Sequence, residues 1–278
     1  CGILVKINTK TGETKLLLSD SLNGVAPLFR NAVSYKGKLY FCGSVRTNGG
    51  KSGLPAVYEI DPKTDDWKVV YQGLSSADDY RDAYQQGIST GIRGMCVHDG
   101  QLVISNVGKD PEYEGPGKKF VATILTSSDP SKGPGSFTEI ANSGTLRGYP
   151  AIRYQDSIYG GAIWDMVSYN GHLYATICTG TPDNAPDDNS MQSFAMVRGD
   201  KNADGSYSWT PIVGDKADGA KYCFGIDPAR TRSGAANLIV YNDYLYIGEY
   251  NDEEIALERI LFNKSNNEEG GKRGMGGV

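Results

Sequence analysis

The chain has 278 residues, with 28 Lys and Arg against 33 Asp and Glu and a formal net charge of -5. This negative charge argues against an extended nucleic-acid-binding surface. No run approaches the roughly 18 consecutive apolar residues that a membrane-spanning helix needs.

The chain begins with a pattern typical of a polar hairpin and continues with an apolar one. In residues 4–17, two β-forming runs flank a polar turn. In residues 30–40, two apolar runs flank Lys36-Gly37. A two-residue turn of this kind needs positive φ at both central positions, which Gly, Asn and Asp tolerate best. Both stretches therefore predict antiparallel hairpins.

The apolar hairpin occurs four times, and the copies align without gaps. Their turn pairs are Lys-Gly, Asp-Gly, Asn-Gly and Asn-Asp, and they start about 63, 71 and 72 residues apart. This spacing exceeds the roughly 40–50 residues of common propeller repeats, so each unit should carry extra loop. The copies are residues 30–40, 93–103, 164–174 and 236–246.

A more polar hairpin follows each of the first three apolar hairpins, at residues 57–70, 121–140 and 196–213. Residues 4–17 match residues 57–70 position by position. Each repeat is thus an inner apolar hairpin, a long loop and an outer polar hairpin. Four antiparallel strands in this order are typical of a propeller blade.

The predicted fold is all-β, a β-propeller of four-stranded antiparallel blades with about four blades visible in residues 1–262. The ring is expected to close by pairing the N-terminal outer hairpin with the C-terminal inner hairpin, which removes two exposed sheet edges. The alternative is a fragment of a larger ring. Residues 75–86 predict one short surface helix, and residues 263–278 a flexible tail or linker. The predicted segments are blade halves 1–18 and 234–262 and blades 28–73, 91–142 and 162–215.

Two short patterns resemble known propeller repeats. Asp61-Pro62-Lys63-Thr64, followed by Trp67, resembles the outer hairpin of kelch-type propellers. Ser127-Ser128-Asp129 with Gly135-Ser136-Phe137 resembles a degenerate Asp-box of sialidase-like propellers. Both resemblances imply the fold, whereas propellers host many unrelated activities.

Loop lengths indicate where a ligand would bind. The predicted turns within each hairpin are short or modest, and every long loop falls on the opposite face of the ring. Long loops on a rigid scaffold usually carry function. Arg can clamp a carboxylate or phosphate, and Trp can stack on a sugar. The alternative is that these residues fill the channel and hydrogen-bond neighbouring blades. The ligand-binding candidates on this face are Arg30, Asn31, Arg93, Trp164, Asp165, Arg232, Asn237, Glu249 and Tyr250.

Several common chemistries find little support. His98 and His172 are the two histidines, and both are predicted to be solvated turn residues. This argues against a Ser-His-Asp triad or a His-based metal site. Residues 200–205 resemble half of a Ca²⁺-binding loop, but Pro211 occupies the twelfth position where Glu is needed. No catalytic residue, metal or cofactor is assigned. Most of the five cysteines are predicted to be small buried hydrophobic residues, and the alternative is a disulfide formed in an oxidising compartment.

The sequence favours a non-catalytic binding module, secreted or at the cell surface. Its long loops would face a glycan, a protein or other domains of a larger chain, with no nucleic acid and no membrane span. The alternative is a propeller enzyme, sialidase- or lyase-like, that acts on a glycan or acidic small molecule. The sialidase-like resemblance would give roles to Arg30, Arg93, Glu249 and Tyr250, although the Arg-Ile-Pro signature is missing. A cytoplasmic scaffold is a third hypothesis.

Overall fold

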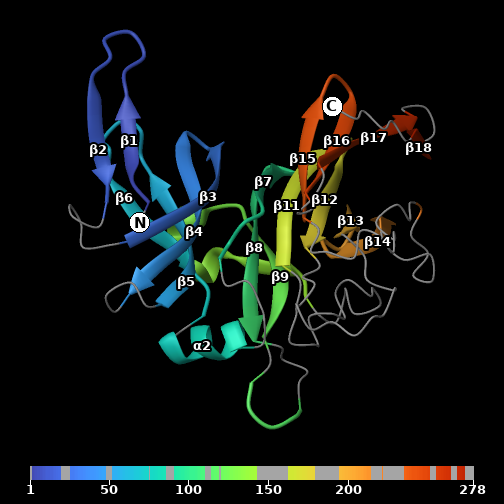
Figure 1. The fold of residues 1–278 in the computed structure, drawn as a ribbon, viewed down its shortest axis with the longest axis horizontal. Helices are drawn as coiled ribbons and strands as arrows, with labels where there is room; N and C mark the ends of the chain where they lie inside the picture. The colour runs from blue at the N-terminus through green and yellow to red at the C-terminus, as the bar shows by residue number, and fades with distance from the viewer. Residues whose placement is uncertain are drawn as a thin grey trace.

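A computed structural model shows the all-β fold that the repeats predict. It describes residues 2–19, 26–47, 52–74, 76–85, 91–109, 114–118, 120–142, 162–178, 194–213, 221, 235–250, 255–263 and 268–272. These residues form four four-stranded antiparallel sheets and one two-stranded sheet. Figure 1 shows the sheets following one another in an arc, from the N-terminal strands to β15–β18.

The sheets are built from strands that follow in chain order. The N-terminal hairpin is β1 (Leu4–Ile7) and β2 (Thr14–Leu18). The first blade is β3 (Ala26–Tyr35), β4 (Lys38–Thr47), β5 (Ser52–Ile60) and β6 (Trp67–Gln72). The second is β7 (Met95–His98), β8 (Gln101–Lys109), β9 (Phe120–Ser127) and β10 (Thr138–Ala141). The third is β11 (Ala162–Tyr169), β12 (His172–Cys178), β13 (Phe194–Lys201) and β14 (Tyr207–Val213). The fourth is β15 (Ala235–Tyr241), β16 (Tyr244–Tyr250), β17 (Ile255–Asn263) and β18 (Glu268–Lys272).

The first strand of each blade lies innermost. Contacts run from β3 to β7, from β7 to β11 and from β11 to β15, so each blade meets the next through this strand. The α-helix α2 (Ala77–Gln85) contacts β5 and confirms the predicted surface helix. Two 3-10 turns, η1 (Pro130–Lys132) and η2 (Pro134–Ser136), connect β9 to β10. Among the described residues, no helix is long and apolar enough to cross a membrane.

The four tight turns have the geometry that their residues predict. Both central residues of each turn have positive φ, between 46° and 80°. Gly meets this requirement in three turns, and Asn242-Asp243 meets it in the fourth. The turn over residues 202–206 is likewise a hairpin turn between β13 and β14, as expected.

The predicted ring closure differs from the structure. β16 pairs with β17 from Tyr244↔Leu261 to Tyr250↔Ile255, and the N-terminal hairpin forms a sheet of its own. Residues 268–272 form β18, in the stretch predicted as a tail. β17 follows β16 after a short connection, so the local pairing costs less loop-closure entropy than pairing the two ends of the chain.

The N-terminal hairpin packs on the first blade. Leu18 is fully buried in an apolar cluster with Leu54 and Tyr58. The Asp65 carboxylate binds Lys6 Nζ at 2.7 Å and Lys15 Nζ at 2.8 Å. Apolar packing and these ion pairs together hold the hairpin against β5 and β6.

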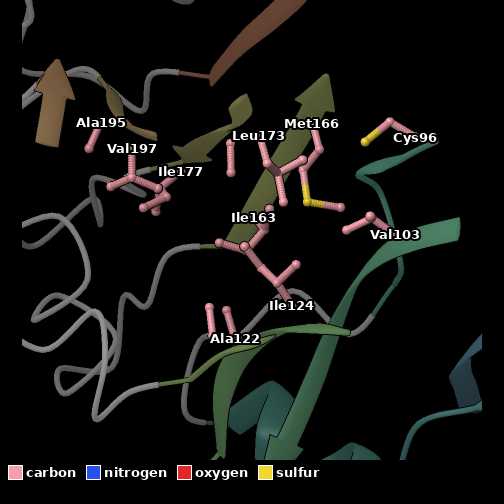
Figure 2. Close-up of a cluster of buried hydrophobic side chains, with 12 residues drawn as sticks. Cys96, Val103, Ala122, Ile124, Ile163, Met166, Leu173, Ile177, Ala195 and Val197 are labelled. Carbon is pink, nitrogen blue, oxygen red and sulfur yellow. The ribbon is translucent and has the colours of Figure 1, made fainter. Parts of the chain in front are cut away.

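Apolar clusters also join the blades. In the cluster between the second and third blades, the side chain of Met166 reaches toward Cys96 and Val103 (Figure 2). Cys96 and Cys42 are buried free thiols, and burial raises the pKa of Cys42 to about 12. The prediction of buried small hydrophobes is confirmed for these two. Cys1 and Cys223, and the side chain of Cys178, lie outside the described residues.

The residue before each of the first three tight turns reaches into the next blade. Tyr35 Oη donates to the Gly100 carbonyl at 2.7 Å, and Tyr169 Oη donates to the Asp243 carbonyl. His98 holds the same position, with Nδ1 2.8 Å from Ser168 Oγ, and is only 4% exposed. The prediction of a solvated His98 is therefore wrong. His172 is half-buried and its Nδ1 contacts Asp200, so it is not a free turn residue either.

Buried His98 should make the stability of the protein depend on pH. Burial lowers the pKa of His98 below 6.5, Lys201 and His172 lower it further, and Asp99 opposes the shift. The unfolded chain then takes up a proton that the folded chain resists, so stability is lost as pH falls through this range. We expect a lower urea midpoint at about pH 5.5 than at about pH 7.5, and a smaller difference in His98→Asn. An unchanged difference in the variant would show that other groups cause it.

Candidate functional site

The inner rim of the arc, where the innermost strands begin, holds most of the predicted binding residues. The register of β3 shifts between Phe29 and Asn31, and that of β11 shifts between Ile163 and Asp165. Each shift is a bulge that leaves one residue out of the pairing: Arg30 in β3 and Trp164 in β11. Bulges redirect side chains and are common beside functional sites.

Residues from three successive blades meet at Trp164. The guanidinium carbon of Arg93, just before β7, lies 4.1 Å from the centroid of the Trp164 ring. The Trp164 indole Nε1 donates to Asn237 Oδ1 of β15 at 3.1 Å. A guanidinium over an indole face is a favourable cation–π pair. We call Arg93, Trp164, Asp165 and Asn237 the rim cluster.

Asp165 is the carboxyl group of the rim cluster, and backbone groups hold both of its oxygens. Oδ1 accepts from the Met166 N–H at 2.8 Å, and Oδ2 accepts from the Leu238 N–H of the fourth blade at 2.8 Å. Burial raises the pKa of Asp165, while these two donors oppose the rise. The group therefore ties two blades together and can carry a proton at a higher pH than an exposed Asp.

Asn31 makes the corresponding tie between the first two blades. Its Nδ2 donates to the Met95 carbonyl at 3.4 Å, and its Oδ1 accepts from the Ala32 N–H at 2.8 Å. Met95 holds the same repeat position as Leu238. For Asn31 the structure thus supports the alternative that rim residues hydrogen-bond neighbouring blades.

The other predicted site residues are placed only in part. Arg30 is exposed on β3, away from the contacts of the rim cluster. Glu249 and Tyr250 lie in β16, in register with Ala236 and Ala235, and their side chains are outside the described residues. Arg232 is outside them altogether. Within the described part of the chain, no group of three or more His, Cys, Asp or Glu could hold a metal ion.

The sequence prediction missed a buried carboxylate between the first two blades. Glu59 of β5 is 4% exposed and accepts from Tyr40 Oη at 2.8 Å and from Ser131 Oγ. Lys38 and Lys68 lie 3.7 and 3.8 Å from its Oε1. The available signal was a charged residue inside an otherwise apolar strand. Through Ser131, Glu59 joins β5 of the first blade to the segment between β9 and β10 of the second.

Neither the protein-family models nor the curated proteins give a match to the sequence. Solved structures do. A GH32 beta-fructofuranosidase of Bombyx mori in complex with sucrose is 11% identical, with a TM-score of 0.42. The alignment covers 90% of this chain and 50% of that one, so the chain spans half the length of that structure.

Two other solved structures are more similar in fold. An alpha-L-arabinanase of Penicillium chrysogenum complexed with arabinobiose is 14% identical with a TM-score of 0.50, covering 96% of this chain and 70% of its own. A thermostable family-43 glycoside hydrolase is 14% identical with a TM-score of 0.51, covering 96% and 83%. At this identity the likeness shows the fold alone, and the propeller prediction is confirmed.

These comparisons confirm one prediction in its coarser form and correct another. They support a propeller in general, but neither the kelch-type nor the Asp-box resemblance in particular. The main prediction of a non-catalytic binding module is wrong against them, because both structures with a TM-score of at least 0.50 described above are glycoside hydrolases.

Proposed function

We propose that the chain is a glycan-acting hydrolase whose active site lies at the rim cluster. The observation that carries the proposal is the geometry of the rim cluster, in which the half-buried carboxyl of Asp165 adjoins Trp164 with Arg93 over its ring and Asn237 at its N–H. Burial raises the pKa of Asp165, which suits a general acid. The fold adds support, because an arabinanase and a family-43 glycoside hydrolase share it. A location outside the cell would suit a glycan substrate and remains a prediction.

The chemistry needs an acid, a second carboxylate and a platform for the sugar. A protonated Asp165 would donate its proton to the leaving glycosidic oxygen as that bond breaks, while the second carboxylate takes a proton from the water that attacks the anomeric carbon. Glu249 is our candidate for the second carboxylate. Its backbone pairs with that of Ala236, and Leu238, two residues further along β15, donates its N–H to Asp165. Trp164 would stack on the sugar, and Arg93 and Asn237 hold the indole ring of Trp164 in place.

The direct test is hydrolysis of a panel of oligosaccharides by the purified chain. The panel should contain arabinobiose and longer arabino-oligosaccharides, other neutral disaccharides and acidic oligosaccharides. We expect release of reducing ends from at least one class. Absence of product from every class, with a folded protein by circular dichroism, would refute the proposed function.

Trp164→Ala separates sugar binding from packing. The ring is half-buried and makes one hydrogen bond, so its loss should destabilise less than the ~3–5 kcal/mol typical of a fully buried Trp. Sugar affinity should fall by about tenfold or more, since the platform is gone. Trp164→Phe is the control, because it retains a stacking ring and loses only the hydrogen bond to Asn237. Calorimetric titration and urea unfolding of both variants give the two quantities.

A further inference from the structure

Three outer hairpins carry an aromatic residue at the same repeat position, and two of the three pack on the preceding blade. Phe137 packs against Tyr71 with ring centroids 4.9 Å apart. Trp209 donates its indole N–H to the Ile140 carbonyl at 3.2 Å and stacks on Tyr207. Trp67 is the third of these aromatic residues. The first blade, to which it belongs, is preceded by the N-terminal hairpin and not by another blade.

Trp67 lines a groove between that hairpin and the first blade. The groove has a volume of about 410 Å³. This is within the roughly 300–1,000 Å³ of small-molecule sites. It lies beside β6, at the edge of the first sheet opposite the innermost strand β3 (Figure 1). It is therefore separate from the rim cluster. Its lining residues are Lys15, Leu16, Leu17, Thr64, Asp65, Asp66 and Trp67, and we call it the hairpin groove.

The lining combines an apolar platform with polar groups that can take hydrogen bonds. Trp67 is half-buried against Tyr58, and within the described part of the chain its indole N–H has no acceptor, unlike that of Trp209. Leu16, in the same wall, is 41% exposed. Asp66 presents an exposed carboxylate that can accept hydroxyl protons.

The walls of the groove are held in place. Asp65 ion-pairs with both Lys6 and Lys15 of the hairpin, and the bond from Lys15 holds the pKa of Asp65 below its usual value. Lys6 also donates to the Pro62 carbonyl at 3.0 Å. These bonds fix β2 relative to the turn before Trp67, so the groove is formed before a ligand enters.

We propose that the hairpin groove is a second glycan-binding site, which holds a sugar residue of a neutral glycan away from the rim cluster. A sugar presents an apolar C–H face, which suits Trp67 and Leu16, and hydroxyl groups, which suit Asp66 and the indole N–H. Asp65 is paired with Lys6 and Lys15, but the exposed Asp66 carboxylate disfavours an acidic sugar. The choice of a glycan rests on the proposed function, whereas the position of the site rests on the groove itself.

The test measures binding of neutral arabino- and gluco-oligosaccharides by calorimetric titration in a Trp164→Ala, Asp165→Asn background, where both turnover and sugar binding at the rim cluster are weakened. Trp67→Leu keeps apolar volume but removes the platform and the N–H, and Asp66→Asn removes the carboxylate. We expect Trp67→Leu to weaken binding by about tenfold or more, and Asp66→Asn by less. Trp209→Phe, at the matched repeat position of the third blade, should leave the affinity unchanged.

The outcomes separate this inference from the proposed function. If Trp67→Leu binds the glycan with the same affinity as the background protein, and thermal melting shows that both are folded, the hairpin groove is not a glycan site. Hydrolysis by the wild-type chain together with that result leaves the proposed function standing. Trp67-dependent glycan binding by a wild-type chain that hydrolyses no glycan supports the groove and refutes the hydrolase.

Discussion

Replacing Asp165 by Asn is expected to lower glycan hydrolysis by about 10²–10⁴-fold, the usual contribution of a positioned acid. An amide cannot donate the proton that the leaving oxygen needs. The effect should be chemical rather than a loss of substrate binding, because Trp164, Arg93 and Asn237 are left in place. The measurement is kcat for the best substrate in the panel.

The pH profile shows whether Asp165 is the acid. Burial raises its pKa, and a general acid works only while protonated, so activity should fall as pH rises through that pKa. This limb of the profile should be absent from the residual activity of Asp165→Asn. A variant that retains the wild-type rate would exclude Asp165 as the acid.

A stability measurement must accompany the Asp165 variant, because the carboxylate also ties the third blade to the fourth. The amide oxygen of Asn can accept a hydrogen bond from only one of the two N–H groups, those of Met166 and Leu238. Its NH₂ group then faces the other N–H, and that hydrogen bond is lost. One unmade buried hydrogen bond costs about 1–3 kcal/mol. Urea unfolding shows whether the variant is folded under assay conditions.

Tyr58→Ala is expected to destabilise the fold by about 3–5 kcal/mol, as large-to-small changes of buried aromatic residues do. Tyr58 is fully buried in β5, and its ring centroid lies 5.5 Å from that of Phe29 and 6.3 Å from that of Trp67. It lies in the cluster that also contains Leu18 of the N-terminal hairpin. The change should therefore loosen both the first blade and the attachment of the hairpin.

Tyr58→Phe is the matched control. It keeps the ring and removes only the hydroxyl, which donates to the Ser44 carbonyl at 3.3 Å. We expect it to cost about 1 kcal/mol, the net value of one hydrogen bond. Urea unfolding gives the free energy of unfolding for both variants. A Tyr58→Ala protein within 1 kcal/mol of Tyr58→Phe would contradict the packing described for this cluster.

The site could be predicted from the sequence only in outline. The repeat alignment placed Arg93, Trp164, Asp165 and Asn237 near one another, since equivalent positions of successive blades lie side by side. It left open whether these residues bind a ligand or hydrogen-bond neighbouring blades, and only the structure shows that Asn31 and Asp165 hydrogen-bond the next blade. Nor could it show a groove at Trp67, because the groove needs two segments about 50 residues apart in the chain.

The sequence by itself determined the hairpins, the blade pattern and the short helix. Positive φ in a two-residue turn and alternation along a strand are properties of a few neighbouring residues, so Asn170-Gly171 or Asp99-Gly100 can be read directly. The tertiary structure alone decided the burial of His98, the raised pKa of Asp165, and the pairing of β16 with β17 in place of β1. Each depends on which segment lies against the residue, and that choice is made by packing between blades whose sequences are far apart in the chain.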